Sequence, residues 1–131
     1  MIRRDARGTA AIEFALTMPL LLLAFFAVFE TYRLVQAQRV LDVAVNAGLR
    51  YGAVRSGSAS AADISGVVTN AAKALLGAPG GAVSSTVGFS PAYAPGDTLS
   101  VTVQYAWVPA FLAAEFPSIT LKSSGAITVQ N

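Results

Sequence analysis

The chain of 131 residues contains no cysteine and no histidine. Without cysteine it can form no disulfide bond, thiol nucleophile, zinc–thiolate site or lipidated cysteine. Without histidine it lacks the commonest general base and the commonest metal ligand. Charged residues are also scarce, at 12% of the chain against about 25% in ordinary soluble domains. We therefore expect no enzymatic activity, no cofactor and no metal site.

The few charges are unevenly placed along the chain. The first eight residues, MIRRDARG, contain three arginines and one aspartate and so account for the net charge of +2. The rest of the chain carries equal numbers of acidic and basic side chains. Because no basic stripe lies beyond residue 8, we expect no nucleic-acid partner.

What the sequence does contain is an apolar run near its start. No charge occurs from Phe14 to Phe29, and only Thr17 and Pro19 within this run are not apolar. At about 1.5 Å per residue, a helix over this run is slightly shorter than a hydrocarbon core of about 30 Å. Starting the helix at Thr9 makes it long enough, but the longer segment then includes Glu13. We predict a membrane anchor over about residues 9–30.

The flanking charges predict the orientation of this anchor. The arginines and the amine of the leader precede it, and fewer positive charges follow it closely, which favours a cytoplasmic N-terminus with the remainder of the chain across the membrane. A cleaved secretory signal peptide is the competing interpretation. It is disfavoured because the following FETYRLVQAQ contains no convincing A-x-A cleavage site.

The helical pattern continues beyond the anchor. Apolar residues recur at spacings of three and four between residues 34 and 47, without an interrupting proline. They are Leu34, Ala37, Leu41, Ala44 and Ala47. We therefore predict one long helix over residues 9–53 that ends near Gly52, and its second half, being amphipathic, requires a partner surface.

The remainder predicts a short helix and an antiparallel sheet. Residues 54–62 are expected to be a linker, and Asp63 is expected to be the N-cap of a helix that ends before Gly77. The face of this helix predicted to be buried carries Val67, Ala71, Ala74 and Leu75.

Strict alternation predicts a half-buried strand over residues 98–107, with an earlier strand over 83–89. One or two closing strands are expected over 119–129, with residues 122–125 as a bend or bulge between them. The sheet would have one apolar face, which the amphipathic half of the long helix would cover. The predicted fold class is α+β.

Two groups of residues after the apolar run are candidates for a site. The acidic residues are far apart in sequence, and a solvated surface position is expected for each: Glu30, Asp42, Asp63, Asp97 and Glu115. Four aromatic residues could line a groove for a sugar or another ligand, although packing in the core is favoured: Tyr93, Tyr105, Trp107 and Phe111.

The N-terminal residues resemble a known family. A basic leader ends at Gly8, the string TAAIEF follows at residues 9–14, and an apolar helix comes next. This arrangement resembles the precursors of type IVb pilins of the Tad/Flp class, and the stretch over residues 3–53 is similar to the TadE-like pseudopilins. Major Flp pilins are much shorter, so the comparison favours a minor pseudopilin.

The resemblance implies roles for individual residues. Gly8 would precede the bond cut by a prepilin peptidase, Thr9 would become the new N-terminus, and Glu13 would be the assembly carboxylate. The expected fold is pilin-like, and the expected location is the inner membrane. The expected partners are the peptidase, other pilins, the Tad inner-membrane platform and lipid. The function implied is assembly of a Tad pilus and support of its secretion and attachment.

The chemistry of these residues agrees with the implied roles. Placing an unpaired carboxylate in hydrocarbon costs on the order of several kcal/mol of free energy. Cleavage after Gly8 would create an amine on Thr9 that could pair with Glu13 of the same or a neighbouring chain. Pro19 removes one helical hydrogen bond, so a kink or local melting is expected there. The alternative is an uncleaved, signal-anchored periplasmic binding domain.

Overall fold

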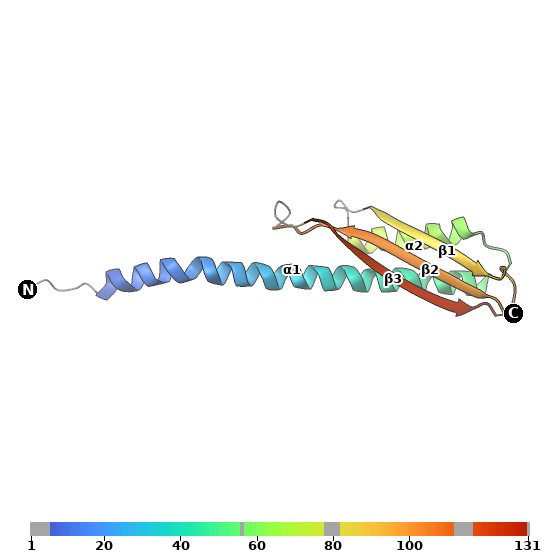
Figure 1. Cartoon of the computed structure of the whole chain (residues 1–131), viewed down its shortest axis with the longest axis horizontal. Helices are drawn as coiled ribbons and strands as arrows, with labels where there is room; N and C mark the ends of the chain where they lie inside the picture. The colour runs from blue at the N-terminus through green and yellow to red at the C-terminus, as the bar shows by residue number, and fades with distance from the viewer. Residues whose placement is uncertain (1–5, 56, 78–81, 112–116, 131) are drawn as a thin grey trace, which may run out of the picture.

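The computed structural model describes residues 6–55, 57–77, 82–111 and 117–130. Its order is α1 (Ala6–Val54), α2 (Ala61–Leu76), β1 (Val83–Ser90), β2 (Thr98–Trp107) and β3 (Ile119–Thr128). Figure 1 shows a globular part around the second half of α1, from which the first half projects alone. This arrangement confirms the predicted α+β class and the long N-terminal helix.

Helix α1 is one uninterrupted helix of 49 residues. It begins at Ala6, so the Gly8–Thr9 junction lies inside its first turns, whereas the sequence predicted a start near Thr9. Its second half buries a single stripe in the core: Ala37, Leu41, Ala44, Val45 and Leu49. Leu34 and Ala47, also predicted for this face, are half-buried. The spacing of three and four thus identified the correct face.

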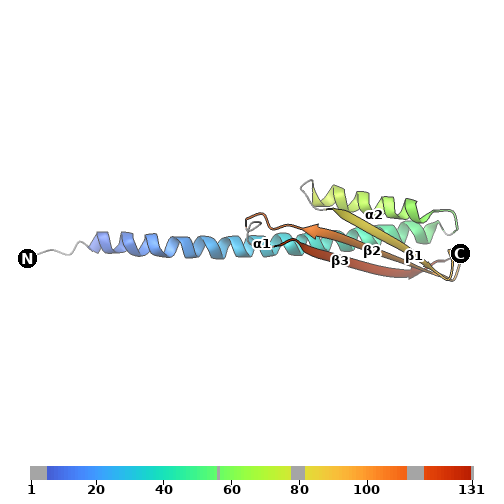
Figure 2. The same cartoon turned by 45° about the horizontal axis from the view of Figure 1, so that its top comes forward.

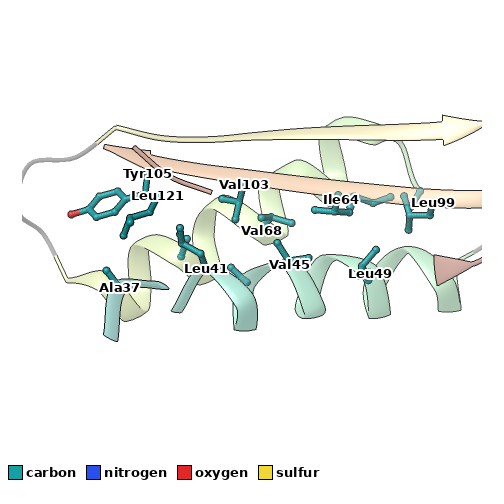
Figure 3. Close-up of a cluster of buried hydrophobic side chains, with 14 of the residues drawn as sticks. Ala37, Leu41, Val45, Leu49, Ile64, Val68, Leu99, Val103, Tyr105 and Leu121 are labelled. Atoms are coloured by element: carbon teal, nitrogen blue, oxygen red, sulfur yellow. The ribbon is translucent and has the colours of Figure 1, made fainter. Parts of the chain in front are cut away.

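The three strands form an antiparallel sheet in the order β1-β2-β3. Strand β2 alternates as predicted and buries every second side chain: Leu99, Val101, Val103, Tyr105 and Trp107. Both helices lie on the same side of the sheet, as the two views show (Figures 1 and 2). Figure 3 shows α1, α2 and β2 all contributing side chains to one core.

Two glycines of α1 allow this close packing. A Cβ atom on Gly48 would lie 2.3 Å from Val68 Cγ2, and one on Gly52 would lie 2.3 Å from Leu99 Cδ2. Such distances are far below van der Waals contact, so a larger residue would force α2 and β2 away from α1. Glycine at 48 and 52 therefore sets how closely the helices and the sheet approach.

The structure corrects two predictions for α2. Its N-cap is Ser60, whose hydroxyl accepts a hydrogen bond from the Asp63 amide (3.2 Å), while Asp63 accepts one from the Ser60 amide (2.9 Å). This is a capping box, in which the acidic residue is the third helical position and not the cap. The helix therefore begins at Ala61, inside the predicted linker.

The predicted buried face of α2 was also wrong. The buried residues are Ile64, Val68 and Ala72, whereas Ala74 and Leu75 are exposed. Val67 and Ala71 are half-buried. Apolar residues occur on most sides of this helix, so spacing alone could not select the face. In the folded chain, the buried face is selected by the space above Gly48, which the side chain of Val68 fills.

The end of the chain forms one strand. Residues 122–125 are continuous with β3 and pair with residues 101–104 of β2, so the expected bend is wrong. Ser123 points inward and donates a hydrogen bond to Asp42 Oδ1 (2.6 Å). A Cβ atom on Gly125 would lie 2.8 Å from Leu49 Cδ1, so glycine at this position allows α1 to pack closely against β3. These polar and small residues are internal features of a strand.

Candidate functional site

The predicted cleavage junction lies at the projecting end of α1. Gly8 and Thr9 are helical and exposed, and a Cβ atom on Gly8 would meet nothing within 4 Å. The first amides of a helix have no partner within the helix, which makes its first turn the easiest to unwind. The junction is thus accessible to an enzyme that binds this segment in an extended form.

Glu13 follows Thr9 by four residues on the same exposed helix. Side chains four apart in a helix lie on the same face, about 5–6 Å apart at Cβ. The backbone carbonyl of Glu13 accepts a hydrogen bond from Thr17 Oγ1 (3.0 Å). A terminal amine on Thr9 would therefore be created near the Glu13 carboxylate.

Pro19 lies within α1 and does not interrupt it. The helix continues through this position in the structure, and the kink or melting expected at Pro19 stays a prediction. One missing amide removes a single hydrogen bond, and the remaining turns hold the helix on both sides. Pro19 therefore lowers the number of backbone hydrogen bonds in α1 locally without ending the helix.

The segment around these residues is apolar and almost wholly uncovered. The exposed fractions are 70% for Ile12, 78% for Leu16, 71% for Leu20 and 71% for Val28. By length and composition α1 is able to cross a membrane. A helix that is apolar on all sides requires lipid or other helices around it, so this half fits a single-pass membrane anchor.

Glu30 marks the end of the apolar segment and is buried, with 8% of its surface exposed. Its carboxylate accepts hydrogen bonds from the Ala110 amide (2.7 Å) and from Arg33 Nη1 (3.1 Å). The solvated position predicted for Glu30 is therefore wrong. The spacing of Glu30 and Arg33 at the end of an apolar run hinted at an ion pair, but nothing in the sequence indicated the Ala110 amide.

The other acidic residues remain near the surface. Asp42 accepts a hydrogen bond from Ser123, and Asp97 Oδ2 accepts one from the Ala94 amide (3.1 Å). Hydrogen bonds from Ser60 hold the pKa of Asp63 below its ordinary value. Glu115 lies outside the described residues. Across the described part of the chain, no three His, Cys, Asp or Glu residues are grouped as a metal site would require.

The aromatic residues divide between the core and the surface. Tyr105 and Trp107 are buried, as favoured, and Tyr93 stacks on Phe89 with ring centroids 4.4 Å apart. Phe111 is 53% exposed and lies against α1. A cavity of about 210 Å³ beside Arg33 is lined by side chains of α1, α2 and β2 together with Val108, and Trp107 forms one wall.

The comparisons with known proteins concern this same helix. The family described as TadE-like protein matches residues 8–50, which confirms the resemblance over nearly all of α1. The match connects the chain with Tad pilus systems. No significant match was found among curated proteins or solved structures.

Proposed function

We propose that this protein is a minor pseudopilin that supports assembly of a Tad-type pilus and its secretion machine. Its precursor is cut by a prepilin peptidase between Gly8 and Thr9. Helix α1 holds it in the inner membrane with the N-terminus in the cytoplasm and the globular part in the periplasm. Its partners are other pilins and the inner-membrane platform of the Tad machine.

The placement of Glu13 carries this proposal. A carboxylate lies one helical turn from the Gly8–Thr9 junction, and long apolar side chains surround it along an uncovered helix. An acidic group in such a segment is costly unless a cation pairs with it. Cleavage would supply that cation as the Thr9 amine and would remove the positively charged leader.

The pairing also gives a reason for assembly. Within one chain the amine is attached to the same helix as its carboxylate, whereas an amine on a neighbouring, axially shifted helix can approach Glu13 from the side. Because an unpaired charge between apolar helices is unfavourable, only certain shifts between subunits satisfy it. Glu13 would therefore set the register of packed α1 helices.

The second candidate is an uncleaved, anchored binding domain. The cavity beside Arg33 favours it, because an aromatic wall and a cation can bind a small polar ligand. This candidate predicts that the mature protein still begins at Met1.

The test is the N-terminus of the protein made together with its cognate prepilin peptidase. Intact-mass and N-terminal analysis should find a chain that begins at Thr9. Gly8→Ala should slow this cleavage, and since the added methyl group meets no neighbour, a slower reaction would report recognition by the peptidase and not misfolding. A chain that still begins at Met1, or that is cut near Glu30, contradicts the proposal.

Assembly is tested separately with Glu13→Gln, which keeps the size of the side chain and removes its charge. Cleaved Glu13→Gln protein should remain in the membrane but associate less with pilus components in sheared and cross-linked fractions. Ile12→Leu, on the neighbouring exposed position, is the matched control and should associate normally. Equal association of both variants would argue against the pairing.

A further inference from the structure

We propose that the turn after β2, Val108–Phe111, is a membrane-contacting foot that inserts into the leaflet nearest the globular part. The partner is the lipid bilayer itself. This inference rests on α1 as a membrane anchor and does not depend on cleavage or on a role in pili.

The position of the foot follows from the direction of β2. This strand runs toward the projecting half of α1, and the turn that follows it lies at the end of the globular part that faces this half (Figure 1). Phe111 stacks on Phe26 with ring centroids 4.7 Å apart and meets Phe29 edge-on at 5.9 Å. The foot therefore touches α1 inside its apolar run.

The depth of Phe26 places Phe111 in lipid. A helix from Thr9 to Phe29 has about the length of a hydrocarbon core of ~30 Å. Phe26 precedes Glu30 by four residues, about one helical turn, and so lies ~6 Å closer to the membrane centre. Because the Phe111 ring stacks on the Phe26 ring, a bilayer that surrounds Phe26 also reaches Phe111.

The charges at this level are arranged to tolerate lipid. Glu30 is the first ionisable residue after the apolar run, and the foot covers it by donating the Ala110 amide to its carboxylate (2.7 Å). Arg33 donates to the same carboxylate (3.1 Å), and its Cζ lies 6.0 Å from the Trp107 ring centroid. A paired and covered carboxylate avoids the cost that a bare one has at the membrane boundary.

The surface left uncovered continues that of the anchor. Phe111 is 53% exposed, Val108 43% and Phe29 43%, and Tyr32, one residue before Arg33, is 59% exposed. The phenylalanine rings lie on the membrane side of Tyr32. This order matches membrane interfaces, where an amphipathic tyrosine lies at the level of the headgroups and apolar rings lie deeper. Lipid is thus the partner that the chemistry of this surface fits.

Spin labelling tests the foot in the full chain. Because the protein has no cysteine, Phe111→Cys gives one labelling position. The labelled protein is reconstituted in vesicles of phosphatidylethanolamine and phosphatidylglycerol, and collision rates with oxygen and with a water-soluble nickel chelate are compared. Leu20→Cys serves as the reference within the anchor and Val54→Cys, at the far end of α1, as the reference in water.

The expected result is a shift of the oxygen-to-nickel ratio at residue 111 away from the value at 54 and toward the value at 20. The same shift is expected for Val108→Cys, which leaves the Phe111 stacking intact. A label at 111 and 108 that behaves as at residue 54 overturns the proposal. Low collision rates with both reagents would show that protein covers the foot and would equally overturn it. Because uncleaved chains should give the same ratios, failure here is distinguishable from failure of the processing test.

Discussion

The two halves of α1 have the same backbone and opposite surroundings. In residues 8–29, apolar side chains point in every direction and only Phe26 is partly covered. In residues 37–52, one stripe centred on Leu41 is buried, while Arg39, Asp42 and Asn46 on other sides are exposed. One helix thus meets two different environments, and the change occurs near Glu30.

The difference shows what helical periodicity records. A stripe appears only where a helix has a core on one side and water on the other. Where the surroundings are apolar on all sides, nothing selects a face and the periodicity disappears. The first half of α1 therefore contains little information about which neighbours it packs against, apart from its one carboxylate.

The largest effect is expected when a leucine side chain is removed from each half of α1 in turn. Leu41 is fully buried and Leu20 is 71% exposed. Leu41→Ala should lower the free energy of unfolding of the globular part by about 2–5 kcal/mol, because it leaves a cavity in the core. Leu20→Ala should change it by less than about 0.5 kcal/mol.

Both variants can be measured as full chains in detergent micelles by denaturant unfolding. Fluorescence of Trp107, the single tryptophan, reports on the core because its side chain is buried. Equal losses of stability in the two variants would contradict the contrast, since they would show that both halves unfold as one unit with the core.

A smaller effect is expected from adding one methyl group to α1. Gly48→Ala places a Cβ atom 2.3 Å from Val68 Cγ2, and valine has little rotamer freedom with which to yield. Overpacking of this kind costs about 1–3 kcal/mol. In the other half, Gly8→Ala meets nothing within 4 Å and should leave the unfolding free energy unchanged.

The control for helix propensity is Gly66→Ala in α2, where the new methyl group also meets nothing within 4 Å. It should stabilise the protein by up to about 1 kcal/mol, the usual advantage of alanine over glycine in a helix. If Gly48→Ala were as stable as Gly66→Ala, the close approach of α1 and α2 would not constrain residue 48.

The sequence predicted those elements whose pattern has a local cause. The stripe around Leu41 and the alternation of Leu99, Val101 and Val103 follow from contact with a core on one side, and both were predicted correctly. The resemblance around Gly8 and Glu13 was likewise confirmed at the level of the family. The processing and pairing roles of these two residues stay predictions.

The sequence-based predictions failed where a contact between residues far apart in the sequence determines the structure. The face of α2 depends on Val68 filling the space above Gly48, and the burial of Glu30 depends on the Ala110 amide. The continuity of β3 depends on pairing with β2 and on Asp42 receiving the Ser123 hydroxyl. These partners are far apart in sequence, so periodicity and local turn chemistry contain no record of them.

The smallest expected effect concerns the end of α1 opposite the junction. The Tyr93 hydroxyl donates to the carbonyl oxygens of Gly52 (2.6 Å) and Arg55 (3.0 Å). Both carbonyls also accept backbone amides, Gly52 from Arg55 (3.2 Å) and Arg55 from Ser58 (3.0 Å), so the hydroxyl adds a side-chain hydrogen bond to the turns that close this end of α1. Tyr93→Phe should therefore cost about 0.5–1.5 kcal/mol of unfolding free energy near neutral pH.

The same contact predicts a dependence on alkaline pH. Burial raises the pKa of the Tyr93 hydroxyl, and Tyr51 nearby contributes further. The folded state thus holds this proton more tightly than the unfolded state, whose tyrosines titrate near pH ~10. The stability from Tyr93 should be complete below that pH and should be lost as the pH rises through the higher pKa of the folded state.

Denaturant unfolding between pH 8 and 11 tests this dependence by the difference between wild type and Tyr93→Phe. The difference should be constant at first and should shrink as the pH rises, because a phenolate can no longer donate to Gly52 and Arg55. Tyr32→Phe, on an exposed tyrosine, controls for the general effect of alkali. A difference that does not change up to the pH at which the wild type unfolds would show that the Tyr93 hydroxyl does not hold this end of α1.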